Sequence, residues 1–200
     1  MRIGLFFGSF DPIHIGHIGV ANTVINSGLV DAVYFVVAFA NPWKNTATPY
    51  KWRVDMTRMA LRGCENLYVS TVEGTMFKES GKASFFTFDV LNKINEENVV
   101  KGEKVHDFFI ITTQETYSEI PKWVHGEEVM KNNKFIILKS PRFENITFTP
   151  KEGDIVIECP NFPVNSTLVR NMTRENKELI PYVLPNVAKF IKKNNLYVNG

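Results

Sequence analysis

Short apolar runs alternate along the chain with longer segments in which apolar residues recur at helical spacing. The short runs predict strands and the longer segments predict helices. The run 32–38, AVYFVVA, is apolar on both faces, as a central parallel strand should be. Strands are expected over 3–7, 32–38, 67–72, 108–112, 135–138 and 155–158, and helices over 14–26, 52–62, 86–95, 118–131 and from 167 onward.

This alternation predicts an α/β fold, a doubly wound parallel sheet with right-handed crossovers. We expect residues 1–200 to form a single domain whose C-terminal part, 165–200, is a small helical region. Gly28 is placed to end the first helix, and Pro185 is placed to open the last one. Ligands of such sheets bind at the carboxyl ends of the strands. The segment that follows the first strand is therefore a candidate site.

Composition and charge narrow the class of protein. The 200 residues are 44% hydrophobic and 22% charged, with a formal net charge of +2. This argues against binding to nucleic acid or membrane through bulk charge, but leaves room for a local basic pocket. The chain start lacks the features of a signal peptide, and no apolar run approaches the roughly 20 residues that cross a bilayer. Cys64 and Cys159 match no metal spacing and are expected to be reduced thiols, so we expect a cytoplasmic protein.

The stretch GSFDPIHIGH, residues 8–17, follows the first predicted strand. Gly8 lets the chain leave that strand in a conformation that a side chain would forbid, and the Asp-Pro pair after it predicts a turn. His14 then lies near the start of a helix with His17 on the same face, and Gly16 leaves space between them. A helix N-terminus attracts phosphate, and two imidazoles add donors for oxygens that gain charge during a reaction.

Other interpretations of the two histidines fit less well. Both could be ordinary polar residues on the exposed side of an amphipathic helix, but their glycine-rich setting directly after a strand favours a site. A zinc site would need a third ligand nearby. The dinucleotide fingerprint G-x-G-x-x-G is absent, which argues against an ordinary Rossmann dehydrogenase.

GSFDPIHIGH resembles the H-x-G-H signature of the nucleotidyltransferase superfamily, and residues 165–170, NSTLVR, are similar to its second signature, S-T-x-x-R before a helix. Ser or Thr at an N-cap with Arg one turn later makes a second anion site. The resemblance implies a Rossmann-like fold in which both signatures hold the phosphates of ATP. The ATP-binding residues that it implies are Gly8, Ser9, Phe10, His14, Gly16, His17, Glu115, Ser166, Thr167 and Arg170.

Further stretches resemble one family of that superfamily, the bacterial nicotinate-nucleotide adenylyltransferases. Residues 41–44, NPWK, resemble P-P-H-K; residues 53–56 resemble R-x-x-M; residues 86–91 resemble S-Y-T-x-D-T-L; and 113–115 with 120–123 resemble G-[AQ]-D followed by L-P-K-W. The resemblance implies mononucleotide binding by Ser9, Lys44, Arg53, Thr87 and Trp123, and catalytic roles for His14, His17 and Lys44.

The resemblance also gives Trp123 and Glu115 particular tasks. Trp123 would stack on the pyridine ring, and Glu115 would hold the adenosine ribose. A core position for Trp123 and a structural ion pair for Arg53 are the alternatives. Four residues depart from the family pattern: Trp43 in place of His, Phe86 in place of Tyr, Thr113 in place of Gly and Glu115 in place of Asp.

These motifs imply transfer of AMP from ATP to nicotinate or nicotinamide mononucleotide, with release of pyrophosphate. The mononucleotide phosphate is itself the nucleophile, so the protein must supply alignment and charge stabilisation rather than a general base. Mg²⁺ is expected to bridge ATP oxygens with few protein ligands. The alternatives are a sister adenylyltransferase acting on pantetheine phosphate and a non-catalytic nucleotide-binding regulator. A homo-oligomer is possible, and the preferred mononucleotide is open.

Overall fold

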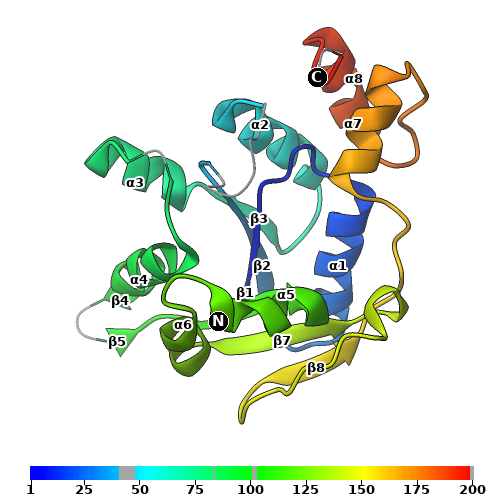
Figure 1. Ribbon diagram of the computed structural model, residues 1–200. Helices are drawn as coiled ribbons and strands as arrows, with labels where there is room; N and C mark the ends of the chain where they lie inside the picture. Colours follow the sequence, from blue (N-terminus) through cyan, green and yellow to red (C-terminus); the bar gives the residue numbers. More distant parts are fainter. Residues whose placement is uncertain (41–47, 83, 101–102, 199–200) are drawn as a thin grey trace.

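The computed structural model describes residues 1–40, 48–82, 84–100 and 103–198. Its centre is a six-stranded sheet in the order β3-β2-β1-β6-β7-β8, and every neighbouring pair in it is parallel (Figure 1). The strands are β1 (Arg2–Gly8), β2 (Ala32–Val37), β3 (Leu67–Ser70), β6 (Asp107–Thr113), β7 (Lys134–Lys139) and β8 (Ile155–Glu158). A short antiparallel pair, β4 (Val99–Val100) and β5 (Glu103–Lys104), lies outside this sheet.

Helices cover both faces of the sheet, and each face has its own hydrophobic core. One core contains buried residues of α1 (Ile15–Asn26), α2 (Tyr50–Leu61), α7 (Ser166–Arg174) and α8 (Pro185–Lys193). The other contains buried residues of α3 (Val72–Ser80), α4 (Thr87–Glu97), α5 (Gln114–Glu119), the 3-10 turn η1 (Ile120–Lys122) and α6 (Gly126–Asn132). A second 3-10 turn, η2 (Pro141–Phe143), follows β7. The predicted doubly wound α/β fold is confirmed.

The strand order reverses at the centre of the sheet. From β1 the chain adds β2 and then β3 on one side, and it then returns to place β6, β7 and β8 on the other side. Such a reversal leaves a crevice at the carboxyl ends of the two central strands, where no crossover connection covers them. Here those strands are β1 and β6, so the stretch 8–17 begins at this crevice.

Two predicted elements are wrong. Residues 118–131 do not form one helix but divide into the end of α5, η1 and α6. Pro121 lies in the 3-10 turn, and a Cβ on Gly126 would meet the main-chain oxygen of Ile120 at 1.9 Å, so the chain bends sharply between them. The strand predicted over 67–72 ends at Ser70, because Val72 begins α3, a helix that the pattern did not reveal.

The C-terminal region is helical only in part. The helix α7 ends at Arg174, and Asn176 then has a left-handed φ of 51°. As expected, Pro185 opens α8 at its first position. Gly28 follows Ser27, the C-cap residue of α1, and has a left-handed φ of 71°, which suits a residue without a side chain.

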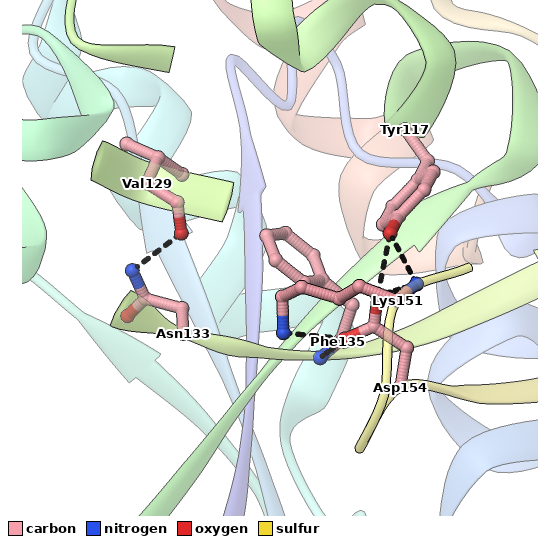
Figure 2. A network of polar contacts seen from close by, with 6 residues as sticks. All are labelled: Tyr117, Val129, Asn133, Phe135, Lys151 and Asp154. Atoms are coloured by element: carbon pink, nitrogen blue, oxygen red, sulfur yellow. Dashed lines mark hydrogen bonds and ion pairs between the residues drawn. The ribbon is translucent and has the colours of Figure 1, made fainter. Parts of the chain in front are cut away.

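A buried carboxylate fastens the segment before β8 to the rest of the fold (Figure 2). The Asp154 side chain accepts hydrogen bonds from the Tyr117 hydroxyl at 2.5 Å and from the Phe135 amide at 3.1 Å. It also accepts from the Lys151 ammonium at 3.1 Å, and no part of the Asp154 side chain is exposed. Phe135 lies near the start of β7, so this network stands at the amino end of that strand.

Replacement of Tyr117 by Phe is expected to lower the free energy of unfolding by about 1.5–3 kcal/mol, because a hydrogen bond to a buried charge is lost. Urea unfolding followed by circular dichroism measures the change. Tyr68→Phe is the matched control, since the Tyr68 side chain is 49% exposed, and it should shift stability by less than about 0.5 kcal/mol. Equal stabilities of the two variants would contradict the role of this network.

Candidate active site

The turn after β1 is shaped by close packing of aromatic rings. We expected Gly8 to adopt a conformation that a side chain would forbid, but the left-handed residue of this turn is Phe10, whose φ is 48°. This conformation folds the Phe10 ring back over Gly8, where a Cβ would meet it at 2.8 Å. Gly8 is therefore required for the space it leaves rather than for its backbone angles. Gly16 has a similar role, since its Cβ would lie 3.0 Å from both the His14 ring and Val164.

The two histidines lie at the start of α1, as the sequence predicted. His14 is the N-cap residue, and its ring stacks on that of His17 with centroids 3.6 Å apart. Nδ1 of His17 accepts a hydrogen bond from the His14 amide at 3.2 Å. A neutral His17 therefore carries its proton on Nε2, which can donate to a ligand oxygen. Nδ1 of His14 is buried and meets no hydrogen-bond partner among the described residues.

Burial keeps both imidazoles uncharged in the free protein. Desolvation lowers the pKa of His14 from its ordinary value of 6.5 to about 4. Desolvation, and then the nearby His14, lower the pKa of His17 well below its ordinary value. An anionic ligand at this place would favour the charged forms and raise both pKa values again.

The second signature lies against this turn. The cap of α7 is Asn165, whose side chain accepts from the Leu168 amide at 2.8 Å, so the expectation of Ser or Thr at the cap is wrong. Ser166 and Thr167 instead occupy the first helical positions. The Ser166 hydroxyl donates to the carbonyl of Pro12 at 3.0 Å.

Arg170 completes the contact between the two signatures. One of its terminal nitrogens donates to the carbonyl of Asp11 at 2.8 Å, and the other donates to the Thr167 hydroxyl at 3.1 Å. The N-terminus of α7 is thus joined by hydrogen bonds to the turn that leads into α1.

A cavity of about 130 Å³ opens at the carboxyl end of β6. Thr87 at the start of α4 and Trp123 after η1 both line it, although they are far apart in the chain. Phe6 also lines the cavity, and its ring lies edge-on to His17 with centroids 6.0 Å apart. Trp123 is 38% exposed, so it is a wall of the cavity rather than a core residue.

Two of the departures from the family pattern fall on α5, which begins directly after β6. Thr113 caps this helix, because its hydroxyl accepts from the Thr116 amide at 3.2 Å, and both threonines line the cavity. Glu115 is exposed in the first turn of the same helix. Phe86, the third departure, is the exposed N-cap residue of α4.

Arg53 is buried and engaged by the main chain. Its guanidinium donates to the carbonyls of Ser9, Ala38, Phe39 and Thr48 at 2.7–3.1 Å, and the residue is 1% exposed. Four of its five N–H donors are therefore used within the protein. This geometry does not support the predicted contact with the mononucleotide. It favours the structural alternative, with carbonyls rather than an ion pair as the partners.

Glu73, which the sequence analysis did not single out, lies in the same region. Its carboxylate accepts from the Phe39 amide at 2.6 Å, and burial raises its pKa to about 7. Lys44, predicted as a catalytic residue, and its neighbours Asn41, Pro42 and Trp43 lie outside the described residues.

Within the described ranges, no three His, Cys, Asp or Glu side chains gather in a way that could hold a metal ion. The groups around the turn are imidazole, hydroxyl and guanidinium, which suit phosphate oxygens rather than a cation. In the same part of the chain, no helix combines the length and apolarity that a membrane span requires.

Comparison with known proteins assigns the fold and both signatures to one family. The family model described as cytidylyltransferase-like matches residues 5–172. The chain belongs to this family. A relative from Caldicellulosiruptor saccharolyticus, named probable nicotinate-nucleotide adenylyltransferase, is 31% identical over 98% of this chain and 99% of its own. A relative of the same name from Flavobacterium johnsoniae is 28% identical, and the match covers 98% of this chain and 99% of the relative.

Solved structures share the α/β fold described above. The nicotinic acid mononucleotide adenylyltransferase of Plasmodium falciparum, complexed with NaAD, superposes with a TM-score of 0.80 over 98% of this chain and 97% of its own. Its sequence is 19% identical to this one, so the likeness concerns the fold alone. The family membership that the motifs indicated is confirmed.

The pKa of His14 makes the stability of the free protein depend on pH. In the unfolded chain this residue takes up a proton near pH 6.5, whereas in the folded chain it does so only near pH 4. Stability should therefore fall as the pH drops through this window, by about 1 kcal/mol between pH 7 and 5.5 for this residue. The variant His14→Asn keeps a good N-cap and should show a smaller fall in urea unfolding. A wild-type slope in His14→Asn would contradict the assignment.

Proposed function

We propose that this chain transfers AMP from ATP to a pyridine mononucleotide, with nicotinate mononucleotide as the preferred acceptor, and releases pyrophosphate. The observation that carries the proposal is the direct contact of α7 with the Asp11–Pro12 turn. It brings two helix N-termini and two imidazoles to one place beside the cavity lined by Trp123. The names of the relatives support nicotinate as the pyridine.

The reaction needs alignment more than acid-base catalysis. The mononucleotide phosphate attacks the α-phosphorus of ATP, the new P–O bond forms, and pyrophosphate leaves on the opposite side. An anionic phosphate needs no base to activate it. The protein therefore has to hold two anions in line and stabilise the charge that spreads over the α-phosphate and the leaving pyrophosphate.

The two histidines suit this task because they are uncharged and oriented before ATP binds. His17 presents its Nε2 proton, since its other nitrogen is engaged by the main chain. His14, desolvated and stacked on His17, would donate to a second phosphate oxygen. Donors that are fixed in advance cost no reorganisation during the reaction. Ser166, Thr167 and Arg170 would hold the β- and γ-phosphates from the other side.

Mg²⁺ is part of the proposal as an ion that arrives with ATP. When bound, it neutralises phosphate charge and orients the leaving pyrophosphate. The phosphate-seeking groups around the turn fit an ion held mainly through ATP oxygens.

At the acceptor side, Trp123 and Thr87 would hold the pyridine ring, and Ser9 and Lys44 would lie near the mononucleotide phosphate. Glu115, exposed in the first turn of α5, would hold the ATP ribose. Arg53 would act only indirectly, by holding the main chain of Ser9 and of residues 38–39. A cytoplasmic location belongs to the same proposal, and both cysteines are free thiols.

The substrate is tested by measuring pyrophosphate release with ATP and three acceptors: nicotinate mononucleotide, nicotinamide mononucleotide and pantetheine phosphate. We expect the highest kcat/KM with nicotinate mononucleotide, because the names of the relatives point to nicotinate and the Trp123 side chain offers a flat face to a pyridine ring. Highest turnover with pantetheine phosphate would overturn the assignment. Binding of ATP without release of pyrophosphate from any acceptor would indicate the non-catalytic regulator.

Replacement of either His14 or His17 by Ala is expected to lower kcat by roughly 10²-fold or more, as removal of one preorganised donor does in other enzymes. Steady-state kinetics with saturating ATP measures the effect. His125→Ala is the control, because that imidazole is exposed and lies after η1. Near-normal turnover after either change at the start of α1 would refute the role of the pair.

A further inference from the structure

The end of the chain reaches back to the turn that carries the histidines. The hydroxyl of Tyr197 donates to the carboxylate of Asp11 at 2.6 Å, across a sequence separation of 186 residues. Asp11 is 5% exposed and Tyr197 is 8% exposed, so this hydrogen bond is shielded from water. A hydrogen bond to a buried charge holds its partners more firmly than one between neutral groups.

The backbone near the C-terminus is bent to make this contact. After α8, the chain turns with Asn195 at a φ of 48° and Tyr197 at a φ of 63°. The left-handed conformation is unusual for an aromatic residue and persists only where surrounding contacts enforce it. Leu196 between them is buried in the core beside α8, and its amide donates to the Ile191 carbonyl at 3.1 Å. This anchored bend directs the phenol toward Asp11.

Asp11 is contacted by the C-terminal region through both its main chain and its side chain. Its carbonyl accepts from Arg170, and the next carbonyl, that of Pro12, accepts from Ser166. The amide of Ile15, the first residue of α1, donates to the carbonyl of Tyr182. The main chain of the turn is thus held by the region after residue 165. Tyr197 adds a contact with the Asp11 carboxylate, the one carboxylate side chain of this turn.

We propose that Tyr197 is a positioning residue for adenylyl transfer: its hydroxyl anchors the Asp11 carboxylate and thereby holds the turn, with His14 and His17, against α7. Tyr197 itself touches no phosphate in this scheme. It acts through Asp11, which lies three residues before His14. The inference rests on the proposed function for its catalytic consequence, but its structural content can be measured separately.

The first experiment compares Tyr197→Phe with Tyr117→Phe. Both substitutions remove one buried hydroxyl that donates to a carboxylate, and Tyr117 lies in the network at the amino end of β7 (Figure 2). Tyr197→Phe should lower kcat roughly tenfold with KM for ATP within about threefold, because small misplacements of catalytic groups mainly affect the chemical step. Tyr117→Phe should leave both parameters near wild type at a comparable loss of stability. Equal kinetic effects of the two variants would overturn the proposal.

The second experiment reads the histidines directly, without any substrate. The ring nitrogen and proton resonances of His14, His17, His106 and His125 are followed by NMR. In Tyr197→Phe the signals of His14 and His17 should shift or broaden, while those of His106 and His125 stay in place. In Tyr117→Phe the signals of His14 and His17 should not move. Unchanged His14 and His17 signals in Tyr197→Phe would overturn the inference. If the wild type shows no adenylyl transfer yet these signals respond, the proposed function fails and the positioning role stands.

If Tyr197→Phe does not fold, a third comparison tests the anchoring contact from the side of Asp11. Asp11→Asn keeps an oxygen that can accept from the Tyr197 hydroxyl, whereas Asp11→Ala removes it. We expect Asp11→Asn to retain several-fold more activity than Asp11→Ala, and equal losses would contradict the anchoring contact. Where all variants fold, Asp11→Ala with Tyr197→Phe should be no less active than Asp11→Ala alone, because the hydroxyl then has nothing to hold.

Discussion

The site depends on hydrogen bonds that run from α7 to two main-chain carbonyls. Arg170 donates to Asp11 and Ser166 donates to Pro12, so the N-terminus of α7 is held against the turn that leads into α1. Each helix end alone attracts phosphate only modestly. In the function proposed above, both helix ends and the two imidazoles would act on one triphosphate. Its α-phosphate would then lie near His14 and His17, beside the cavity that Trp123 lines.

The same turn is held from its other side by Arg53. A buried guanidinium is stable only where its donors are satisfied, and here the carbonyls of residues 9, 38, 39 and 48 satisfy four of them. These carbonyls belong to the segments that follow β1 and β2 and to the segment that leads into α2. The arginine therefore joins the carboxyl ends of two neighbouring strands. The nearby Glu73 carboxylate partly offsets the effect of burial, which lowers the pKa of Arg53.

Packing also determines the chemistry of the histidines. The His17 ring lies edge-on to Phe10 at a centroid distance of 5.0 Å, and the His14 ring stacks on His17. This apolar setting removes water, lowers both pKa values and keeps the imidazoles neutral until an anion arrives. In the proposed function, this setting would give a pair of donors whose orientation is set before the reaction begins.

The sequence alone determined the fold class, the first strand and helix, the two phosphate-binding signatures and the family, because each of these depends on residues close together in the chain. It also singled out Trp123 and Thr87, but only the tertiary structure brought them to one cavity. Only the tertiary structure, too, revealed Arg53 as a main-chain anchor, Asn165 as the cap of α7 and Tyr197 as a partner of Asp11. The pair Tyr197–Asp11 is separated by 186 residues, and no local pattern marks such a contact. It exists because the chain, after covering both faces of the sheet, returns to the crevice where the strand order reverses.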